Sequence, residues 1–156
     1  MNRLGAAIIM ISKGTPFMQA GEEMLRTKNG DENSYKSSDA INNIDWEALT
    51  PDSDVYKMMQ YYKGLIELRD EYEIFRATNT AVTFGQLPGG GMTVTFDNHM
   101  GSKALVLINP TSQADTFNLT GSWKLLADGT RAGDEVLAAE NGAVTIDACS
   151  VRIYVN

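Results

Sequence analysis

The pattern of apolar and polar positions changes once along the chain, near Thr78. Residues 3–12 are largely apolar and Gly14 follows them, a combination that predicts the end of a buried helix. Residues 16–19 predict a short buried strand. A long polar loop, rich in charges, amides and hydroxyls, then covers residues 21–50, where short helical turns are compatible with the pattern. A polar loop this long in a compact domain is usually functional.

A second helix is predicted over residues 51–74. Thr50-Pro51-Asp52 supplies a hydroxyl N-cap, a proline at the first helical position and an acid in the first turn. Apolar residues then recur at i, i+3 and i+4 until the helix ends near Tyr72 or Glu73. The repeating set is Val55, Met58, Met59, Tyr62, Leu65, Ile66 and Leu68. The first half is therefore expected to run helix, strand, loop, helix.

After Thr78 the apolar residues fall into short alternating runs separated by glycine, proline and asparagine. Such runs predict an antiparallel β-sandwich. Asn141-Gly142 is the strongest hairpin signal in the chain. The predicted strands are Ala81–Phe84, Met92–Asp97, Lys103–Asn109, Thr116–Leu119, Trp123–Ala127, Val136–Ala138, Val144–Ile146 and Val151–Val155.

Composition restricts the classes of partner. The chain has 156 residues, of which 43% are hydrophobic, and its net charge is −7 without any basic run. That charge argues against a nucleic acid and against an anionic membrane surface as partners. The apolar stretch Leu4–Ile11 is too short to span a bilayer and lacks a signal-peptide cleavage pattern. Cys149 is the single cysteine, so an internal disulfide is excluded, and His99 is assigned no function.

The order of elements in the first half is typical of an α/β barrel. In that architecture the polar loop after each strand builds the active-site face. A barrel needs eight strand–helix units, and residues 1–78 supply only one predicted strand. We therefore expect the chain to be the C-terminal part of something larger.

Three consecutive motifs resemble one family of glycoside hydrolases. They are GTPFMQAGEE at 14–23, RTKNGDENSY at 26–35 and INNIDW at 41–46. Together they resemble the last barrel strand and the following loop of pullulanases, the debranching members of the α-amylase-like family. The first motif fits many amylase-like enzymes, whereas the second and third narrow the resemblance to pullulanases. The resemblance continues through the second helix into the β-rich tail.

The resemblance implies two domains and an activity. Residues 1–78 would be the last strand and helix of an incomplete catalytic (β/α)8 barrel, and residues 79–156 a C-terminal β-sandwich domain. The parent enzyme would hydrolyse α-1,6-glucosidic linkages in starch, pullulan or glycogen through two carboxylates, with retention. The catalytic acids of the family lie on earlier barrel strands, upstream of Met1. The chain alone is therefore expected to be inactive.

The adjacent acids Glu22 and Glu23 do not supply a catalytic pair. Glycoside hydrolysis requires two carboxyl groups that face each other across the bond, about 5–9.5 Å apart. Neighbouring residues of an extended chain point to opposite faces, so a structural role in anchoring the loop is preferred. Asp31-Glu32-Asn33 does not form an EF-hand either, because Lys36 occupies the position at which the calcium loop needs a glycine. No cofactor is predicted, although a calcium ion elsewhere in the parent stays open.

Four residues of the loop are the candidate substrate contacts. Acid, amide, hydroxyl and aromatic side chains at a barrel mouth are the types that hydrogen-bond to and stack on glucose rings. By position, the resemblance implies that Asp31, Asn33 and Tyr35 touch the sugar and that Arg26 supports them. The alternative is a loop that its own hydrogen bonds hold together, with no sugar contact.

Two other functions stay open. A stand-alone carbohydrate-binding module would need a row of exposed aromatic side chains on one sandwich face. The tail offers only Phe84, Phe96, Phe117, Trp123 and Tyr154, several at positions expected to be buried. A purely structural module is the other alternative. Trp46 is predicted to be a packing anchor, and Trp123 to lie in the core or on the sheet face.

The partners that follow are an α-glucan, contacted through the parent enzyme, and the barrel portion that would precede Met1. Leu4–Ile11 and Phe17-Met18 would be covered in the parent. In the isolated chain their exposure predicts either a dimer or larger species, or disorder around residues 1–50. The resemblance favours an extracellular or cell-surface bacterial enzyme, and a cytoplasmic one stays open.

Overall fold

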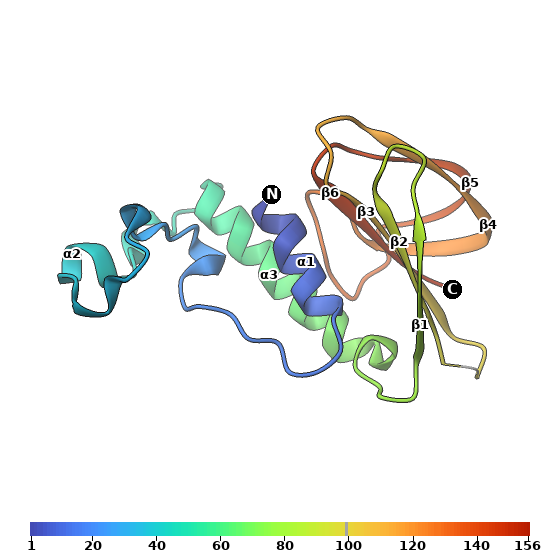
Figure 1. Ribbon diagram of the computed structural model, residues 1–156, viewed down its shortest axis with the longest axis horizontal. Coiled ribbons are helices and arrows are strands. Elements are labelled where there is room, and N and C mark those ends of the chain that lie inside the picture. Colours follow the sequence, from blue (N-terminus) through green and yellow to red (C-terminus); the bar gives the residue numbers. More distant parts are fainter. Residues whose placement is uncertain (99) are drawn as a thin grey trace.

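Two helices, α1 (Asn2–Ile11) and α3 (Asp54–Glu71), lie side by side against a curled β-sheet in the computed structural model (Figure 1). The structure describes residues 1–98 and 100–156, so His99 lies outside the described residues. Both predicted helices are confirmed. The N-cap of α3 is Ser53, whose hydroxyl accepts a hydrogen bond from the Tyr56 amide at 3.0 Å. Thr50 was predicted to be the cap, but Asp52 has a φ of 65°, which interrupts a helix starting at Pro51.

Arg69 of α3 closes the C-terminal end of α1. Its guanidinium donates hydrogen bonds to the backbone carbonyls of Met10 at 2.5 Å, Ser12 at 2.9 Å and Gly14 at 2.6 Å. The last carbonyls of a helix have no partner within the helix, so a buried cation placed there satisfies them and favours the helix dipole. Burial, and next the charge of Arg76, lower the pKa of Arg69. Arg69 thus fixes the direction in which the chain leaves α1.

The strand predicted over residues 16–19 is wrong. The segment is extended but belongs to no strand, and the side chain of Phe17 is 91% exposed. A strand needs a neighbour to satisfy its backbone groups. The strands of the described chain all belong to one sheet formed by later residues, so no neighbour exists for this segment.

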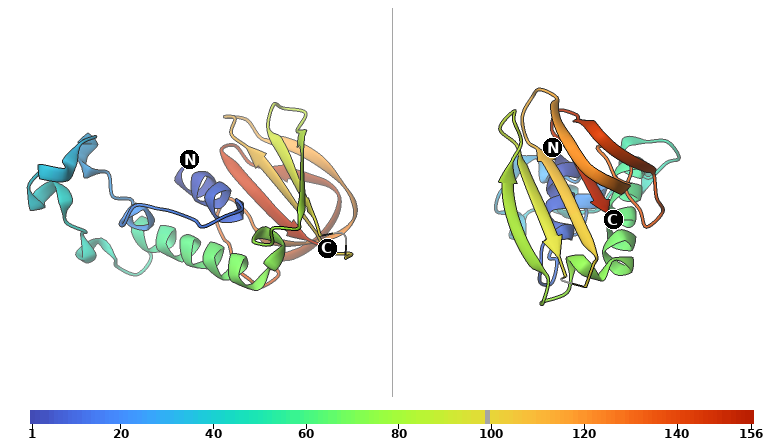
Figure 2. Two further views of the ribbon diagram at one scale, coloured as in Figure 1. Left: turned by 60° about the horizontal axis from the view of Figure 1, so that its bottom comes forward. Right: turned by 90° about the vertical axis from the view of Figure 1, so that its right-hand side faces the viewer.

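Residues 21–50 form an arm that projects from the helices on the side away from the sheet (Figures 1 and 2). The arm consists of short helical turns joined by bends, as the pattern allows. They are η1 (Glu22–Met24), η2 (Lys28–Gly30), η3 (Ser34–Lys36), α2 (Asp39–Asn42) and η4 (Trp46–Ala48). A further turn, η5 (Glu73–Phe75), links α3 to the sheet.

The second half is an antiparallel sheet, as predicted, with the strand order β1-β2-β3-β6-β4-β5. The eight predicted runs form six strands, because neighbouring runs merge in two of them. The strands are β1 (Ala81–Gln86), β2 (Met92–Asp97), β3 (Lys103–Asn109), β4 (Asp115–Ala127), β5 (Ala138–Ile146) and β6 (Ser150–Val155).

The hairpin predicted at Asn141-Gly142 is wrong, because both residues lie inside β5. Along the β4–β5 pair, Leu119 faces Gly142 but Trp123 faces Glu140, so β4 contains two extra residues there. Gly121, inside the bulged stretch of β4, has a φ of 84°, and Gly142, beside it on β5, has a φ of 66°. A glycine in the left-handed region suits a β-bulge as well as a tight turn, so the local signal does not separate the two. The bulge lets a single long strand bend around the core.

Two hydrophobic cores lie on opposite faces of the sheet. The first fills the space between the helices and the sheet, and includes Leu65, Phe75 and Val106. The second lies inside the curl of the sheet, where β3 approaches β5, although the two strands are not hydrogen-bonded neighbours (Figure 2). The sheet is therefore one continuous layer that curls over its own core. It encloses a sandwich-like interior without splitting into two sheets.

Candidate functional site

The arm begins at Gly21, where the backbone must turn sharply. Gly21 has a φ of 94°, and a Cβ atom there would lie 2.6 Å from Cδ of Arg26. Only glycine fits both the conformation and the close approach. The Glu23 carboxylate accepts a hydrogen bond from the backbone N–H of Gly21 at 3.0 Å, so the expected anchoring role is seen for Glu23.

Arg26 joins the start of the arm to Asn42 in its second half. Its Nη1 donates to the Ala20 carbonyl at 2.9 Å, and its Nη2 donates to the Asn42 carbonyl. Its Nε is buried and has no hydrogen-bond partner among the described residues. Arg26 is therefore engaged within the arm.

Asp31 organises the middle of the arm. Its carboxylate accepts hydrogen bonds from the Ser37 hydroxyl and from the backbone N–H of Asn33, the latter at 3.0 Å. The Ser37 hydroxyl and next the Asn33 amide lower the pKa of Asp31, so the group is ionised at neutral pH. Asp31 thus has its carboxylate already committed to its own loop.

Asn42 is a second hub of the arm that the sequence analysis missed. Its side-chain amide donates to the carbonyls of Ser34 at 2.7 Å and Ser37 at 3.0 Å, while its own carbonyl accepts from Arg26. Lys28 also donates to the Ser34 hydroxyl, at 2.7 Å. Nothing in the sequence distinguishes Asn42 from the neighbouring Asn43, because the residues that Asn42 contacts are not next to it in the chain.

The remaining candidates lie on the surface. Asn33 is exposed, and the Tyr35 side chain is 75% exposed with Nζ of Lys36 5.2 Å from its ring centre. Trp46 is 66% exposed, so the prediction that it anchors the packing is wrong in this structure. The arm thus presents two exposed aromatic rings and an amide on a scaffold braced by Arg26 and Asp31.

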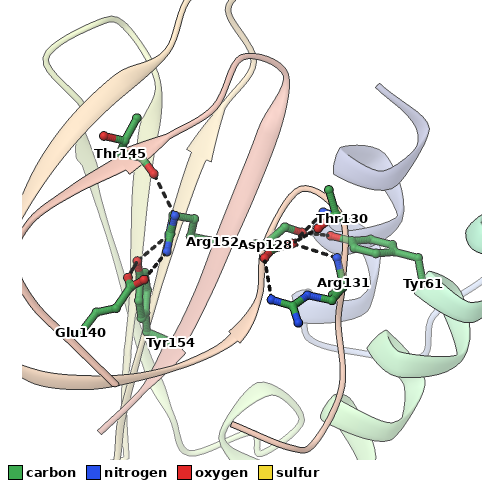
Figure 3. Close-up of polar contacts among 8 residues, drawn as sticks. All are labelled: Tyr61, Asp128, Thr130, Arg131, Glu140, Thr145, Arg152 and Tyr154. Carbon is green, nitrogen blue, oxygen red and sulfur yellow. Dashed lines mark hydrogen bonds and ion pairs between the residues drawn. The ribbon is translucent and has the colours of Figure 1, made fainter. Parts of the chain in front are cut away.

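Two polar clusters outside the arm stabilise the fold (Figure 3). In the first, the Tyr61 hydroxyl of α3 donates to the Asp128 carbonyl at 2.9 Å. The Asp128 carboxylate accepts from the amides of Thr130 at 2.7 Å and Arg131 at 2.8 Å. Burial would raise the pKa of Asp128, but the hydrogen bonds from Thr130 and Arg131 outweigh it and hold that pKa below its usual value. This cluster ties α3 to the segment that follows β4.

The second cluster joins β5 to β6. Nη2 of Arg152 pairs with the Glu140 carboxylate at 2.5 Å, and the Tyr154 hydroxyl donates to the same carboxylate at 2.7 Å. Nη1 of Arg152 donates to the Thr145 carbonyl at 2.9 Å. Burial, and next the bond to Glu140, raise the pKa of Tyr154. Arg152, Glu140 and Tyr154 all have hydrogen-bond partners within the protein, so the cluster stabilises the pairing of β5 with β6.

The described residues contain no group of three or more His, Cys, Asp or Glu side chains arranged to hold a metal ion. Among the helices that the structure describes, none is long and apolar enough to cross a membrane.

No family model matches the chain. The curated relatives include the pullulanase of Bacillus subtilis strain 168, which is 46% identical over 80 residues, or 51% of this chain and 11% of that protein. Pullulanase A of Streptococcus pneumoniae strain D39 is 28% identical in an alignment of 197 positions, gaps included. That alignment covers 92% of this chain and 15% of that protein. The solved pullulanase from Bacillus acidopullulyticus superimposes with a TM-score of 0.86 at 31% identity over 99% of this chain.

The chain is pullulanase-like. It spans between about a tenth and a fifth of the length of these three proteins. In this pullulanase-like chain the four predicted site residues all lie on the arm, but they divide into two kinds. Arg26 and Asp31 bind other parts of the arm, whereas Asn33 and Tyr35 are exposed.

Proposed function

We propose that the chain is part of a glycoside hydrolase that debranches α-glucans by cleaving α-1,6-glucosidic linkages in starch, pullulan or glycogen. One observation carries the proposal: nearly the whole chain superimposes on a solved pullulanase with a TM-score of 0.86. The 46% identity to a second pullulanase, over half of the chain, supports it independently of the structure.

We propose further that residues 1–78 are the last unit of a (β/α)8 barrel, in which residues 16–19 would become a strand only by pairing with strands of the rest of the enzyme, and that residues 79–156 are the β domain that follows it. The order of α1, the extended segment, the arm and α3 supports the first assignment, because a barrel unit runs in that order. Exposed apolar side chains support it too. Phe17, Ile8, Ile9 and Ile66 would be covered by the preceding barrel elements, which are the proposed partner of this part. The isolated chain would bury them by self-association.

The arm is the proposed substrate-binding part. Asn33 and Tyr35 would contact glucose units, because their side chains are exposed and can hydrogen-bond and stack. Arg26 and Asp31 would hold the arm in the shape that presents them, since both are committed to bonds within it. The catalytic carboxylates would come from the rest of the enzyme, so the chain by itself would not hydrolyse glucans.

The alternative of a stand-alone carbohydrate-binding module has little support in the sheet. Such a module needs several aromatic rings on one face. Among the five tail aromatics, Phe84 is exposed to 73%, whereas Phe96 and Tyr154 are buried and Phe117 and Trp123 are half-buried. A purely structural module differs from the proposal only in the role of the arm.

A chimera tests the proposed function. The chain replaces the matching segment of the Bacillus acidopullulyticus pullulanase, and reducing-sugar release from pullulan is measured. A variant of that enzyme without the segment and the isolated chain are the controls. We expect hydrolysis from the chimera and none from either control. Release of sugar by the pure isolated chain, abolished by replacing one of its own acids, would overturn the proposal that the catalytic carboxylates come from the rest of the enzyme.

A further inference from the structure

A cavity lies away from the arm, between α3, the start of α1 and residues 130–137. We propose that this cavity is a second binding site for a neutral oligosaccharide, an α-glucan chain, separate from the contacts of the arm. The cavity measures about 880 Å³, which lies within the range of about 300–1,000 Å³ typical of small-molecule sites. None of Arg26, Asp31, Asn33 and Tyr35 lines it.

The walls of the cavity are fixed without a ligand. Gly64 lets residues 130–134 approach α3, because a Cβ atom there would lie 1.9 Å from the Ala132 carbonyl oxygen. The hydroxyl groups of Tyr61 and Tyr72 donate to the carbonyls of Asp128 at 2.9 Å and Asp134 at 3.3 Å. Figure 3 shows Tyr61 reaching toward Asp128 from α3. A preformed site loses less entropy when it binds, which favours a weakly held ligand such as a sugar.

The lining suits a neutral ligand with many hydroxyl groups. Charges of both signs line the cavity, among them the bases Lys57 and Arg131 and the acids Asp134 and Glu135. Arg131 is paired with Asp128 at 3.8 Å, so its charge is partly compensated. A phosphorylated or strongly acidic ligand would meet the carboxylates, whereas hydroxyl groups accept from the bases and donate to the acids.

Two further features provide the contacts that a sugar ring uses. Tyr56 lines the cavity and is 37% exposed, which leaves part of its ring free to cover an apolar sugar face. Arg3 also lines the cavity, and its buried Nε has no hydrogen-bond partner among the described residues. A buried donor without a partner is costly, and a ligand hydroxyl would satisfy it. Gln60 adds an amide that both donates and accepts.

The geometry alone selects a neutral polyhydroxylated ligand, and the choice of an α-glucan rests on the proposed function. The cavity would hold a second stretch of a long polysaccharide. Two separate contacts on one chain raise the effective concentration of the substrate at the active site.

Nuclear magnetic resonance titration of the ¹⁵N-labelled chain with maltotriose tests the inference. We expect chemical-shift changes for amides of residues 56–67 and 130–137. Tyr56→Ala should weaken binding there about tenfold, the usual effect of truncating an aromatic anchor, and Gln60→Ala should weaken it as well. Tyr35→Ala, the matched control on the arm, should leave the affinity of the cavity unchanged.

Shift changes confined to the arm, or binding at the cavity that neither Tyr56→Ala nor Gln60→Ala weakens, would overturn the inference. Equal affinity for cellotriose would overturn the assignment to α-glucans. The proposed function fails separately, because it is judged by the activity of the chimera. If the chimera is active but maltotriose causes no shift changes at the cavity, the second binding site is refuted and the proposed function stands.

Discussion

Replacing Gly64 by alanine should destabilise the chain, although alanine is the better helix former. In the middle of an exposed helix the exchange would stabilise by about 1 kcal/mol. Here the added Cβ atom would lie 1.9 Å from the Ala132 carbonyl oxygen and 2.5 Å from the Ala132 carbonyl carbon. A backbone contact of that kind cannot be relieved by a side-chain rotation, so residues 130–134 must move away from α3.

The magnitude follows from what that movement breaks. Overpacking of a close contact costs about 1–3 kcal/mol. The hydrogen bonds from Tyr61 to Asp128 and from Tyr72 to Asp134 are each worth about 0.5–1.5 kcal/mol and would be strained or lost. After subtraction of the gain in helix propensity, we expect a net loss of about 1–5 kcal/mol in the free energy of unfolding.

Gly5 of α1 provides the matched control. A Cβ atom at Gly5 would meet nothing within 4 Å, so Gly5→Ala should stabilise the chain by up to about 1 kcal/mol. Urea unfolding followed by circular dichroism measures both variants, with the midpoint compared at unchanged slope. A Gly64→Ala variant as stable as the wild type or more stable would refute the close approach between α3 and residues 130–134.

Three other predictions concern single side chains. Arg69→Met should lower the free energy of unfolding by about 2–4 kcal/mol in the same assay, because three carbonyls in and just after the last turn of α1 lose their donor. Asp128 contributes stability above its unfolded pKa of 3.8, and that stability is lost as pH falls through its lower folded pKa. In the Asp128→Asn variant the free energy of unfolding should therefore fall less steeply as the pH is lowered. An equally steep fall in the variant and the wild type would contradict this. In the active chimera, Asp31→Ala and Tyr35→Ala should each lower kcat/KM on branched maltodextrins about 2–13-fold without moving the pH optimum, and wild-type kinetics in both would make the arm structural.

Helices and strands of this chain were predictable where a periodic apolar face meets one core. The helix at Asp54–Glu71 and the strand at Met92–Asp97 both bury such a face. The strand predicted at residues 16–19 failed because a short apolar run specifies burial but not a partner. The hairpin predicted at Asn141-Gly142 failed because a left-handed glycine serves a bulge equally well.

The exposure of the polar residues in the candidate site was predictable from the sequence, but the hydrogen bonds that each of them makes were not. A polar loop of this composition predicts a binding surface; the structure shows that Asn33 and Tyr35 are exposed, and their contact with a sugar stays a prediction. That Arg26 would be used to close the arm on Asn42 depends on contacts between distant residues, which periodicity does not show. The cavity beside Gly64 was unpredictable for the same reason, since it requires residues 130–137 to fold against α3.

Product analysis of the chimera tests the central claim most directly. Pullulan consists of maltotriose units joined by α-1,6 linkages, so debranching activity converts it to maltotriose. The account predicts that the Bacillus acidopullulyticus pullulanase carrying this chain in place of its own matching segment releases maltotriose as its main product. A chimera that folds, as judged by circular dichroism, yet releases no maltotriose while the parent enzyme does would contradict it.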